Sequence, residues 1–376
     1  MNETRTPVAA LRACLPPEPA PPPPLATAMT DGVPVFDCAM LADALNDGPR
    51  EAELRAAFAA ILLDGAGCLV LRGAVTDMAA LDAASQAFRA IIEAERADAE
   101  ARHDHFAAGG ANDRIWNSLQ KLALADPDAF VAVHGSAWID AVAAAYFGPG
   151  YAMTAQVNLV RPGGAAQEAH RDYHLGFMSA GQAAAYPPHV HAMVPRLTLQ
   201  GAIAHCDMPV ASGTTKLLPH SQTWAEGYLH FRDPAVRALF EERCVQLALA
   251  KGDVLFFDPA LLHAAGENRT ADVERLANLL QISSPFGVPM EAIDRLAMVD
   301  ACYDALAALP EGRARTAAIA AMADGYAFPT SLDTDPPRDG LAPPTMAALL
   351  TRALRTGDTK KVAMAALRAA AHRRRP

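Results

Sequence analysis

The sequence of 376 residues lacks the features that mark several large classes of protein. Its six cysteines are scattered and form no Cys-x-x-Cys pair, which favours reduced thiols in a cytoplasmic protein over a disulfide framework or a zinc knuckle. No apolar run approaches the roughly 20 residues that span a bilayer, so no membrane segment is expected. No apolar segment suitable for secretion follows Arg5. Because 32 basic residues face 42 acidic ones, a nucleic-acid partner is not expected either.

The composition divides the chain into three predicted parts. Residues 1–33 are rich in proline, including the run Pro21–Pro24, and are predicted to form a disordered tail. Residues 34–290 are predicted to form the main globular domain, since 52% hydrophobic residues can build a sizeable core. Residues 291–376 return to helical patterns, broken by Asp335-Pro336-Pro337, and are predicted to be a helical C-terminal extension.

The periodicity of the apolar residues changes along the chain. Helical spacing is found at residues 51–63, after Asp77 and at residues 137–147, with a short apolar strand expected at residues 68–71. The centre of the chain instead has short strand patterns separated by Gly, Pro and Asp turns. These strands are expected at residues 153–160, 196–206, 216–218, 245–249, 254–257 and 276–283. The pattern predicts an α+β fold with an antiparallel double sheet of jelly-roll type and flanking N- and C-terminal helices.

Two histidines and one aspartate give the strongest chemical signal. His170 and Asp172 are separated by one residue, so on an extended segment both side chains lie on the same face. His263 follows a predicted strand much later in the chain. Two imidazoles and a carboxylate can occupy one face of a metal and leave positions open for O₂ and a co-substrate, as non-haem Fe(II) oxygenases require. We therefore predict that His170, Asp172 and His263 ligate Fe(II).

Two other interpretations compete with this one. A second His-x-Asp pair occurs at His205-Cys206-Asp207, but His205 shares a strand face with Leu199 and Ile203, which favours a core position. The triplet at residues 170–172 also matches the catalytic loop of protein kinases. That loop needs asparagine where this chain has Phe177, and the sequence lacks a kinase Gly-rich loop and an Asp-Phe-Gly motif. The first His-x-Asp pair remains the favoured metal site.

Arg275 is a candidate binding residue for a carboxylate. It opens a predicted strand on which it shares a face with apolar residues, where an arginine is costly unless it meets an anion. The distal carboxylate of 2-oxoglutarate would match the fork of the guanidinium. A salt bridge to Asp272 or Glu274 is the structural alternative.

A polar row on the strand at residues 153–160 has two possible roles. Thr154, Gln156 and Asn158 alternate with apolar residues and so share one face. If that face lines a pocket, Gln156 and Asn158 are candidates to bind the co-substrate or the substrate. The alternative is an edge strand whose polar face meets solvent.

These motifs resemble the phytanoyl-CoA dioxygenase family of Fe(II)- and 2-oxoglutarate-dependent oxygenases. The resemblance covers roughly residues 65–286. It rests on His170–His174, Gly201–Ser221, Gly252–Asp258, His263, Gly266, Asn268-Arg269-Thr270 and Arg275. It implies a double-stranded β-helix, with His170, Asp172 and His263 on the iron and Arg275 on 2-oxoglutarate. Asp172 argues against the halogenase variant, in which a halide replaces the carboxylate.

The residues and the resemblance together predict a dioxygenase that uses Fe(II), 2-oxoglutarate and O₂. It is expected to hydroxylate a small organic or lipid-like metabolite and to release succinate and CO₂. The predicted partner is this small-molecule substrate. The sequence specifies neither the identity of the substrate nor the oligomeric state of the protein. Two alternatives are a non-catalytic metal-binding or protein-interaction module on the same barrel, and a cupin-like metal enzyme that uses no 2-oxoglutarate.

Overall fold

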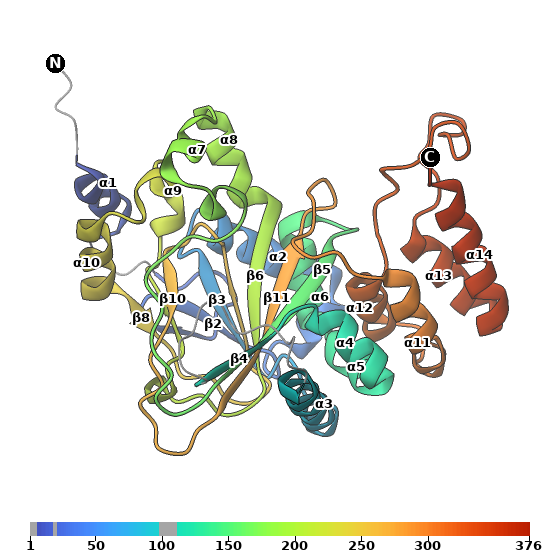
Figure 1. Cartoon of the computed structure of the whole chain (residues 1–376), viewed down its shortest axis with the longest axis horizontal. Coiled ribbons are helices and arrows are strands. Elements are labelled where there is room, and N and C mark those ends of the chain that lie inside the picture. Colours follow the sequence, from blue (N-terminus) through green and yellow to red (C-terminus); the bar gives the residue numbers. More distant parts are fainter. Residues whose placement is uncertain (1–5, 18–20, 98–110) are drawn as a thin grey trace. The chain divides into compact units, whose positions relative to one another are not determined.

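The computed structural model describes residues 6–17, 21–97 and 111–376 (Figure 1). Its strands form two sheets, with the orders β1-β2-β3-β9-β6-β11-β5-β4 and β10-β7-β8. The strands are β1 (Ala28–Thr30), β2 (Val33–Asp37), β3 (Cys68–Arg72), β4 (Asn112–Ile115), β5 (Ala152–Val160), β6 (Thr198–Ala204), β7 (Thr215–Leu217), β8 (Val245–Gln246), β9 (Val254–Phe257), β10 (His263–Ala265) and β11 (Arg275–Ser283). The two sheets and the flanking helices confirm the predicted α+β jelly-roll fold.

The described residues group into two compact units. The first takes residues up to Ala74, residues 111–114 and Val157–Leu280. Its helices are α1 (Pro7–Cys14), α2 (Gly48–Leu63), α7 (Ala180–Ala184), α8 (Pro188–Met193), α9 (Gly227–His230) and α10 (Pro234–Arg243). Short 3-10 helices also lie in this unit, at Ala42–Asn46, His174–Phe177, Val194–Leu197, Val210–Ser212 and Ser221–Thr223.

The second unit takes residues 75–97, 115–156 and 281–376. Its helices are α3 (Met78–Ala97), α4 (Ser118–Ala125), α5 (Pro127–His134), α6 (Ala137–Phe147), α11 (Arg295–Ala308), α12 (Arg313–Met322), α13 (Met346–Thr356) and α14 (Lys360–Arg373). The C-terminal helices therefore cluster with earlier helices of the chain rather than by themselves. Gly357, with φ of 71°, ends α13 before α14 begins.

Strand β3 forms the apolar centre of the larger sheet in the first unit. Its residues Cys68 to Leu71 are all buried, as expected for a continuous apolar run. The strand pairs in parallel with β2, where Val35 lies opposite Val70, and antiparallel with β9, where Phe257 lies opposite Cys68. Strand β9 in turn pairs antiparallel with β6, where Gln200 lies opposite Phe257. This register sets Gln200 next to the segment that leads into His263.

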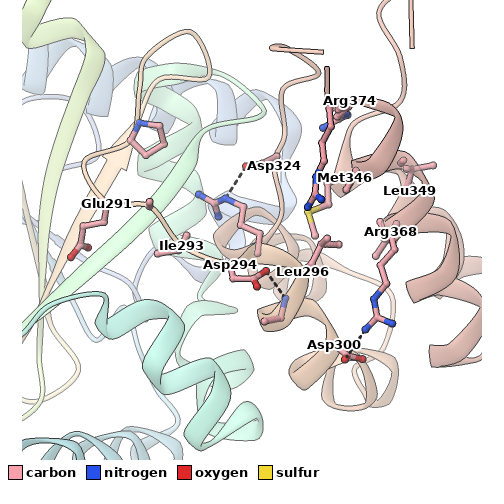
Figure 2. Close-up of a pocket in the computed structure, with 18 of the residues that line it drawn as sticks. Glu291, Ile293, Asp294, Leu296, Asp300, Asp324, Met346, Leu349, Arg368 and Arg374 are labelled. Carbon is pink, nitrogen blue, oxygen red and sulfur yellow. Dashed lines mark hydrogen bonds and ion pairs between the residues drawn. The ribbon is translucent and has the colours of Figure 1, made fainter. Parts of the chain in front are cut away.

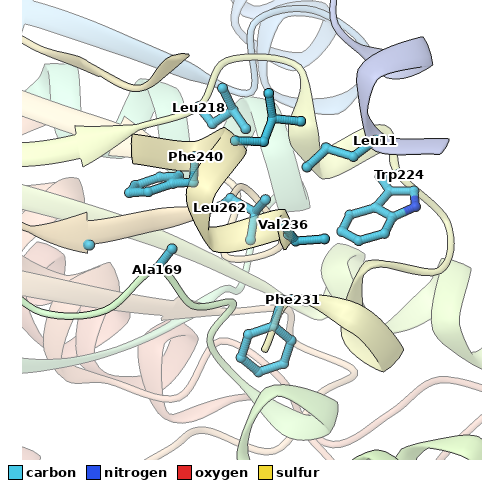
Figure 3. Packing of buried hydrophobic residues seen from close by; sticks show 10 residues of the cluster. Leu11, Ala169, Leu218, Trp224, Phe231, Val236, Phe240 and Leu262 are labelled. Carbon is cyan, nitrogen blue, oxygen red and sulfur yellow. The ribbon is translucent and has the colours of Figure 1, made fainter. Parts of the chain in front are cut away.

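The prediction that residues 1–33 form a disordered tail is wrong for those residues of the range that the structure describes. Thr6 caps helix α1, with Pro7 at its start, and residues Ala28–Thr30 form strand β1. Leu11 of α1 is fully buried in an apolar cluster with Trp224, Val236 and Phe240 (Figure 3). Proline content did not reveal this anchor, which consists of Leu11 and the partly buried Val8, Ala10, Cys14 and Leu15. Residues 1–5 and 18–20 of the predicted tail lie outside the described residues.

The polar row of strand β5 is buried. Thr154, Gln156 and Asn158 are 0%, 2% and 7% exposed, and β4 rather than β5 forms the edge of the sheet. The solvent-facing alternative is therefore excluded. The strand expected at residues 245–249 is shorter than predicted, since β8 ends at Gln246.

Among the described helices, none is by itself both long and apolar enough to cross a bilayer, although the bent pair α5 and α6 passes that test together.

Candidate metal centre

The backbone brings the two predicted histidine ligands side by side. His170 and His263 form an isolated antiparallel bridge, in which each backbone N–H donates to the carbonyl oxygen of the other, at 3.0 and 3.1 Å. Side chains of directly opposed residues project to the same side of such a pair, and the two rings lie 4.4 Å apart between centroids. The neighbouring Ala169, Leu262 and Ala264 belong to the apolar cluster in Figure 3. Side chains alternate between the two sides of the segments around His170 and His263. One side is therefore buried in the apolar cluster, and the two imidazoles project from the other side.

Asp172 completes the group. One ligand atom from each of His170, Asp172 and His263 lies within 4.8 Å of the others. The Asp172 carboxylate oxygens are 3.6 Å from Nε2 of His170 and 3.4 Å from Nε2 of His263. His263 is buried, whereas His170 and Asp172 are partly exposed. Among the described residues, this is the one cluster of His, Cys, Asp and Glu with metal-binding geometry.

Both imidazoles are held in the same way. Nδ1 of His170 lies 2.8 Å from the carbonyl oxygen of Glu168, and Nδ1 of His263 lies 2.8 Å from that of Leu261. A carbonyl can only accept, so each Nδ1 carries a proton and Nε2 is the nitrogen available to a metal. Such backbone contacts fix the tautomer and the ring plane of metal-binding histidines. Phe257 supports the second ring, with its centroid 4.7 Å from that of His263.

Asp172 is oriented by partners on neighbouring segments. Nε2 of Gln200 donates to Oδ2 of Asp172 at 2.6 Å. The Asp172 backbone N–H donates to Pro259 at 3.0 Å, and the Tyr228 hydroxyl donates to the Asp172 carbonyl at 3.3 Å. Directly after Asp172, Tyr173 and His174 both have positive φ, 64° and 44°, which is costly for residues with a side chain. The chain therefore turns away sharply once the ligand pair is in place.

The charges at the centre favour the protonation states that a metal needs. Burial opposes ionisation of Asp172, but the nearby His170, His263 and Gln200 outweigh it and hold the pKa of this carboxyl well below its usual range. Burial, followed by the charge of His263, lowers the pKa of His170. At neutral pH the centre thus offers an anionic carboxylate and a neutral His170 ring.

Arg171 lies between the two ligands in sequence but packs elsewhere. It is 2% exposed, donates to the carbonyl of Ser221, and lies 5.5 Å from the Trp224 ring and 5.3 Å from the Tyr228 ring. A Cβ on Gly227 would meet the guanidinium at 1.9 Å, so glycine is required there. Burial lowers the pKa of Arg171 to about 10, so it stays charged at neutral pH. The triplet at residues 170–172 therefore matches a kinase catalytic loop in sequence only and not in structure.

Arg275 is buried at the start of β11, as predicted. It is 5% exposed, and its Nε has no hydrogen-bond partner among the described residues. The alternative salt bridge is not formed, since Glu274 pairs with Arg161 at 3.3 Å and no ion pair links Arg275 to Asp272 or Glu274. Burial lowers the pKa of Arg275 to about 10. The result is a buried cation that no described carboxylate neutralises, and it forms no hydrogen bond or ion pair with the three candidate ligands.

Gln156 and Asn158 do not contact the three candidate ligands through any hydrogen bond. Nε2 of Gln156 donates to the sulfur of Met290 at 3.7 Å, a weak bond. Oδ1 of Asn158 is buried and has no hydrogen-bond partner within the described part of the chain. An unsatisfied buried amide oxygen is costly unless a ligand or water meets it. The roles of Gln156 and Asn158 in binding the co-substrate or the substrate stay predictions.

The second His-x-Asp pair does not form a cluster. His205 is buried at the end of β6, as predicted, and Oδ1 of Asp207 accepts the backbone N–H of Lys251 at 2.9 Å. Asp207 thus stabilises a turn.

Sequence reasoning missed two residues near the centre. Gln200 is the amide that holds Asp172, and it was detectable as a lone amide in the apolar strand Leu199–Ala204. Arg114 on β4 is close enough for its charge to contribute to the lowered pKa of His170. No pattern in the sequence pointed to Arg114, because only the folded sheet brings β4 near the candidate ligands.

The fold and the centre define a jelly-roll protein with a candidate 2-His-1-carboxylate site. A family model described as phytanoyl-CoA dioxygenase (PhyH) matches residues 63–277, more than half of the chain, and this segment contains the three candidate ligands and Arg275. The chain belongs to the phytanoyl-CoA dioxygenase family, an Fe(II)- and 2-oxoglutarate-dependent family. This membership confirms the resemblance seen in the sequence and agrees with the predicted cofactors.

Curated relatives match a shorter part of the chain. The dioxygenase trt7 of Aspergillus terreus is 28% identical over 153 residues, which cover 41% of this chain and 43% of the relative. The dioxygenase andF of Emericella variicolor is 27% identical over 142 residues, covering 37% and 44%. The chain thus spans less than half the length of these two relatives.

Solved structures show a more distant likeness. The α-ketoglutarate-dependent epimerase SnoN from nogalamycin biosynthesis has a TM-score of 0.43 at 20% identity, covering 64% of this chain and 85% of that one. The carbocyclase SnoK from the same biosynthesis has a TM-score of 0.45 at 18% identity, covering 60% and 83%. The fold assignment rests on the sheets and the family rather than on these likenesses.

Proposed function

We propose that the protein is an Fe(II)- and 2-oxoglutarate-dependent oxygenase that acts on a small organic molecule. The observation that carries this proposal is the arrangement of His170, Asp172 and His263. Their ligand atoms lie within 4.8 Å of one another, with both Nδ1 atoms already bound to backbone carbonyls. Two neutral imidazoles and one carboxylate are the donor set of non-haem iron oxygenases.

The residues fit the two groups that the family uses. His170, Asp172 and His263 would hold the iron, and partial exposure of the first two leaves one side of the site accessible. Arg275 would hold the distal carboxylate of 2-oxoglutarate, because its buried guanidinium lacks a carboxylate partner among the described residues. When bound, iron and 2-oxoglutarate supply the oxidising chemistry, with O₂ consumed and succinate and CO₂ released.

The protein's own residues orient the donors before any ligand arrives. The carbonyls of Glu168 and Leu261 hold the ring protons on Nδ1, so Nε2 of each histidine faces the centre. Gln200 fixes the carboxylate of Asp172 at 2.6 Å. The Phe257 ring packs against the His263 ring, with 4.7 Å between the centroids. These contacts lower the cost of assembling the site.

Hydroxylation of a small organic or lipid-like metabolite is our proposed outcome. Asn158 and Gln156 are proposed to bind the substrate or the co-substrate, since both are buried and Oδ1 of Asn158 has no described partner. An arriving hydroxyl or amide donor would satisfy that oxygen.

Anaerobic reconstitution tests the proposal. Wild-type protein supplied with Fe(II), 2-oxoglutarate and then O₂ is expected to release succinate, and a metabolite pool should contain a compound that accelerates this release. His170→Ala and Asp172→Ala should abolish it, since each removes a ligand. Asp207→Asn is the matched control, because it alters the second His-x-Asp pair and should leave turnover intact. Undiminished succinate release by Asp172→Ala would refute the assignment.

The two alternatives predict different results. A non-catalytic module would release no succinate, and wild-type protein without affinity for Fe(II), Co(II) or Mn(II) would favour a protein-interaction role. A cupin-like enzyme without 2-oxoglutarate would retain its activity in Arg275→Ala. The guanidinium of Arg275, which is buried and has no carboxylate partner among the described residues, favours the 2-oxoglutarate enzyme over both.

A further inference from the structure

A pocket lies within the second unit, in a part of the chain that the family match at residues 63–277 does not reach. Its volume is about 960 Å³, which is in the range of small-molecule sites. The lining comes from the segment before α11, from α11 itself, from Asp324, from α13 and α14, and from Arg374 and Arg375 after α14. Figure 2 shows Met346 and Leu349 on α13 and Arg368 on α14 around the same opening.

Arg295 is the buried cation of this pocket. It is 8% exposed, its Nε lies 2.7 Å from Asp324, and Nη2 donates to the carbonyl of Met153 at 3.2 Å. Nη1 is buried and has no hydrogen-bond partner among the described residues. Nη1 of Arg295, on a side chain that is nine-tenths buried, is thus a charged donor that a ligand could meet. Such a donor is costly to leave unsatisfied.

Arg374 provides a second donor in the same pocket. Its Nη2 donates to the carbonyl of Pro344 at 2.9 Å, whereas its buried Nε has no partner within the described residues. The pocket therefore contains two guanidinium groups, each with a buried N–H that no described acceptor meets. A ligand with two acceptor oxygens would satisfy both.

The acidic residues of the lining are already engaged. Asp324 pairs with Arg295, and Asp300 pairs with Arg368 at 3.2 Å. Asp294 accepts the backbone N–H of Ala297 at 3.0 Å (Figure 2). Oε1 of Glu291 accepts the backbone N–H of Asn117 at 2.7 Å. These four carboxylates equal in number the four arginines of the lining, Arg295, Arg368, Arg374 and Arg375. The lining therefore has no excess positive charge, and the pocket suits a single negative charge better than a dianion such as a phosphate monoester.

The rest of the lining is largely apolar. It includes Leu296, Met346, Leu349 and Leu367, with small alanines on α14. Apolar walls next to two unsatisfied guanidinium donors match a molecule with an apolar body and one carboxylate. We propose that this pocket binds an amphipathic monocarboxylate, with its oxygens on Arg295 and Arg374 and its apolar body against α13 and α14. The proposal is independent of the metal centre.

Calorimetric titration of the full-length, metal-free protein with decanoate tests this site. Decanoate is expected to bind, hexanoate to bind more weakly by about threefold to fourfold per methylene removed, and acetate to show no measurable binding. Decan-1-ol and decyl phosphate should both bind more weakly than decanoate. Omitting the metal removes coordination of the carboxylate to iron.

Three variants locate the site. Arg374→Gln and Arg295→Lys should each raise the Kd of decanoate about tenfold, because each removes one charge-assisted hydrogen bond. The lysine preserves the charge that pairs with Asp324, and a circular dichroism spectrum checks its fold. Ala371→Trp should abolish binding by filling the pocket. Arg355→Gln, an exposed arginine on α13, should leave the Kd unchanged.

Several results would overturn the proposal. They are the absence of decanoate binding to wild-type protein, undiminished binding by Ala371→Trp or Arg374→Gln, and tighter binding of decanol or decyl phosphate than of decanoate. Loss of decanoate binding in His170→Ala would show that the carboxylate uses the metal-centre residues instead. Failure of succinate release, by contrast, would concern the proposed oxygenase alone.

Discussion

Replacing Gln200 with methionine removes an amide donor from the candidate metal centre while keeping a side chain of similar length. Gln200 is buried and donates to Oδ2 of Asp172 at 2.6 Å, so its loss leaves the carboxylate without one of its fixed partners. Partners of this kind contribute about tenfold to a hundredfold to metal affinity, or about 1.4–2.7 kcal/mol. We therefore expect Gln200→Met to raise the Kd for Co(II), used as a spectroscopic substitute for Fe(II), by about that factor.

Anaerobic Co(II) titration followed by absorption measures this change without depending on turnover. Gln246→Met is the matched control, because Gln246 makes a bond of the same length, 2.6 Å, to the carbonyl of Thr214 and not to a candidate ligand. The control should lose some stability but keep its Co(II) affinity within about twofold. Equal Co(II) affinity in wild-type and Gln200→Met protein would refute the idea that this amide positions Asp172.

Three further predictions concern other parts of the molecule. Arg275→Gln should raise the KM for 2-oxoglutarate by about tenfold to a hundredfold, because a charged hydrogen bond contributes about 1.5–3 kcal/mol. The control Arg269→Gln, at an exposed arginine, should leave this KM unchanged. An unchanged KM in Arg275→Gln would mean that Arg275 does not bind the co-substrate. Burial lowers the pKa of His134 from 6.5 to about 4, so the unfolded chain binds more protons between these values and stability rises with pH across that window. His134→Phe should remove up to about 3 kcal/mol of this dependence in urea unfolding between about pH 4.5 and 7.5, and an identical pH slope would contradict it. Leu11→Ala should lower the free energy of unfolding by about 2–4 kcal/mol, since Leu11 is fully buried in the apolar cluster; no change would mean that α1 does not contribute to that core.

The sequence was sufficient to predict three residues that the structure brings together as a candidate metal site, because local patterns and the family resemblance both pointed to them. The alternation in His170-x-Asp172 and the strand leading to His263 both follow from the period of two in extended chain. The buried strand β3 was equally clear, since Cys68 to Leu71 form an unbroken apolar run.

Features that depend on long-range packing were not predictable in the same way. Gln200 meets Asp172 because β6 pairs with β9 in one register, and no local pattern specifies that register. Helix α1 was missed because Leu11 is buried by residues more than 200 positions away, such as Trp224 and Phe240. The polar row of β5 gave two readings because burial of a strand face depends on its neighbours in the sheet.

The most direct test of the proposed centre is an anaerobic crystal structure with Mn(II) and 2-oxoglutarate. We expect the ion at about 2.0–2.2 Å from Nε2 of His170, Nε2 of His263 and an oxygen of Asp172, with the distal carboxylate of 2-oxoglutarate on Arg275. An ion bound elsewhere, for example at His205 and Asp207, or the absence of any ion from the three side chains, would contradict the account.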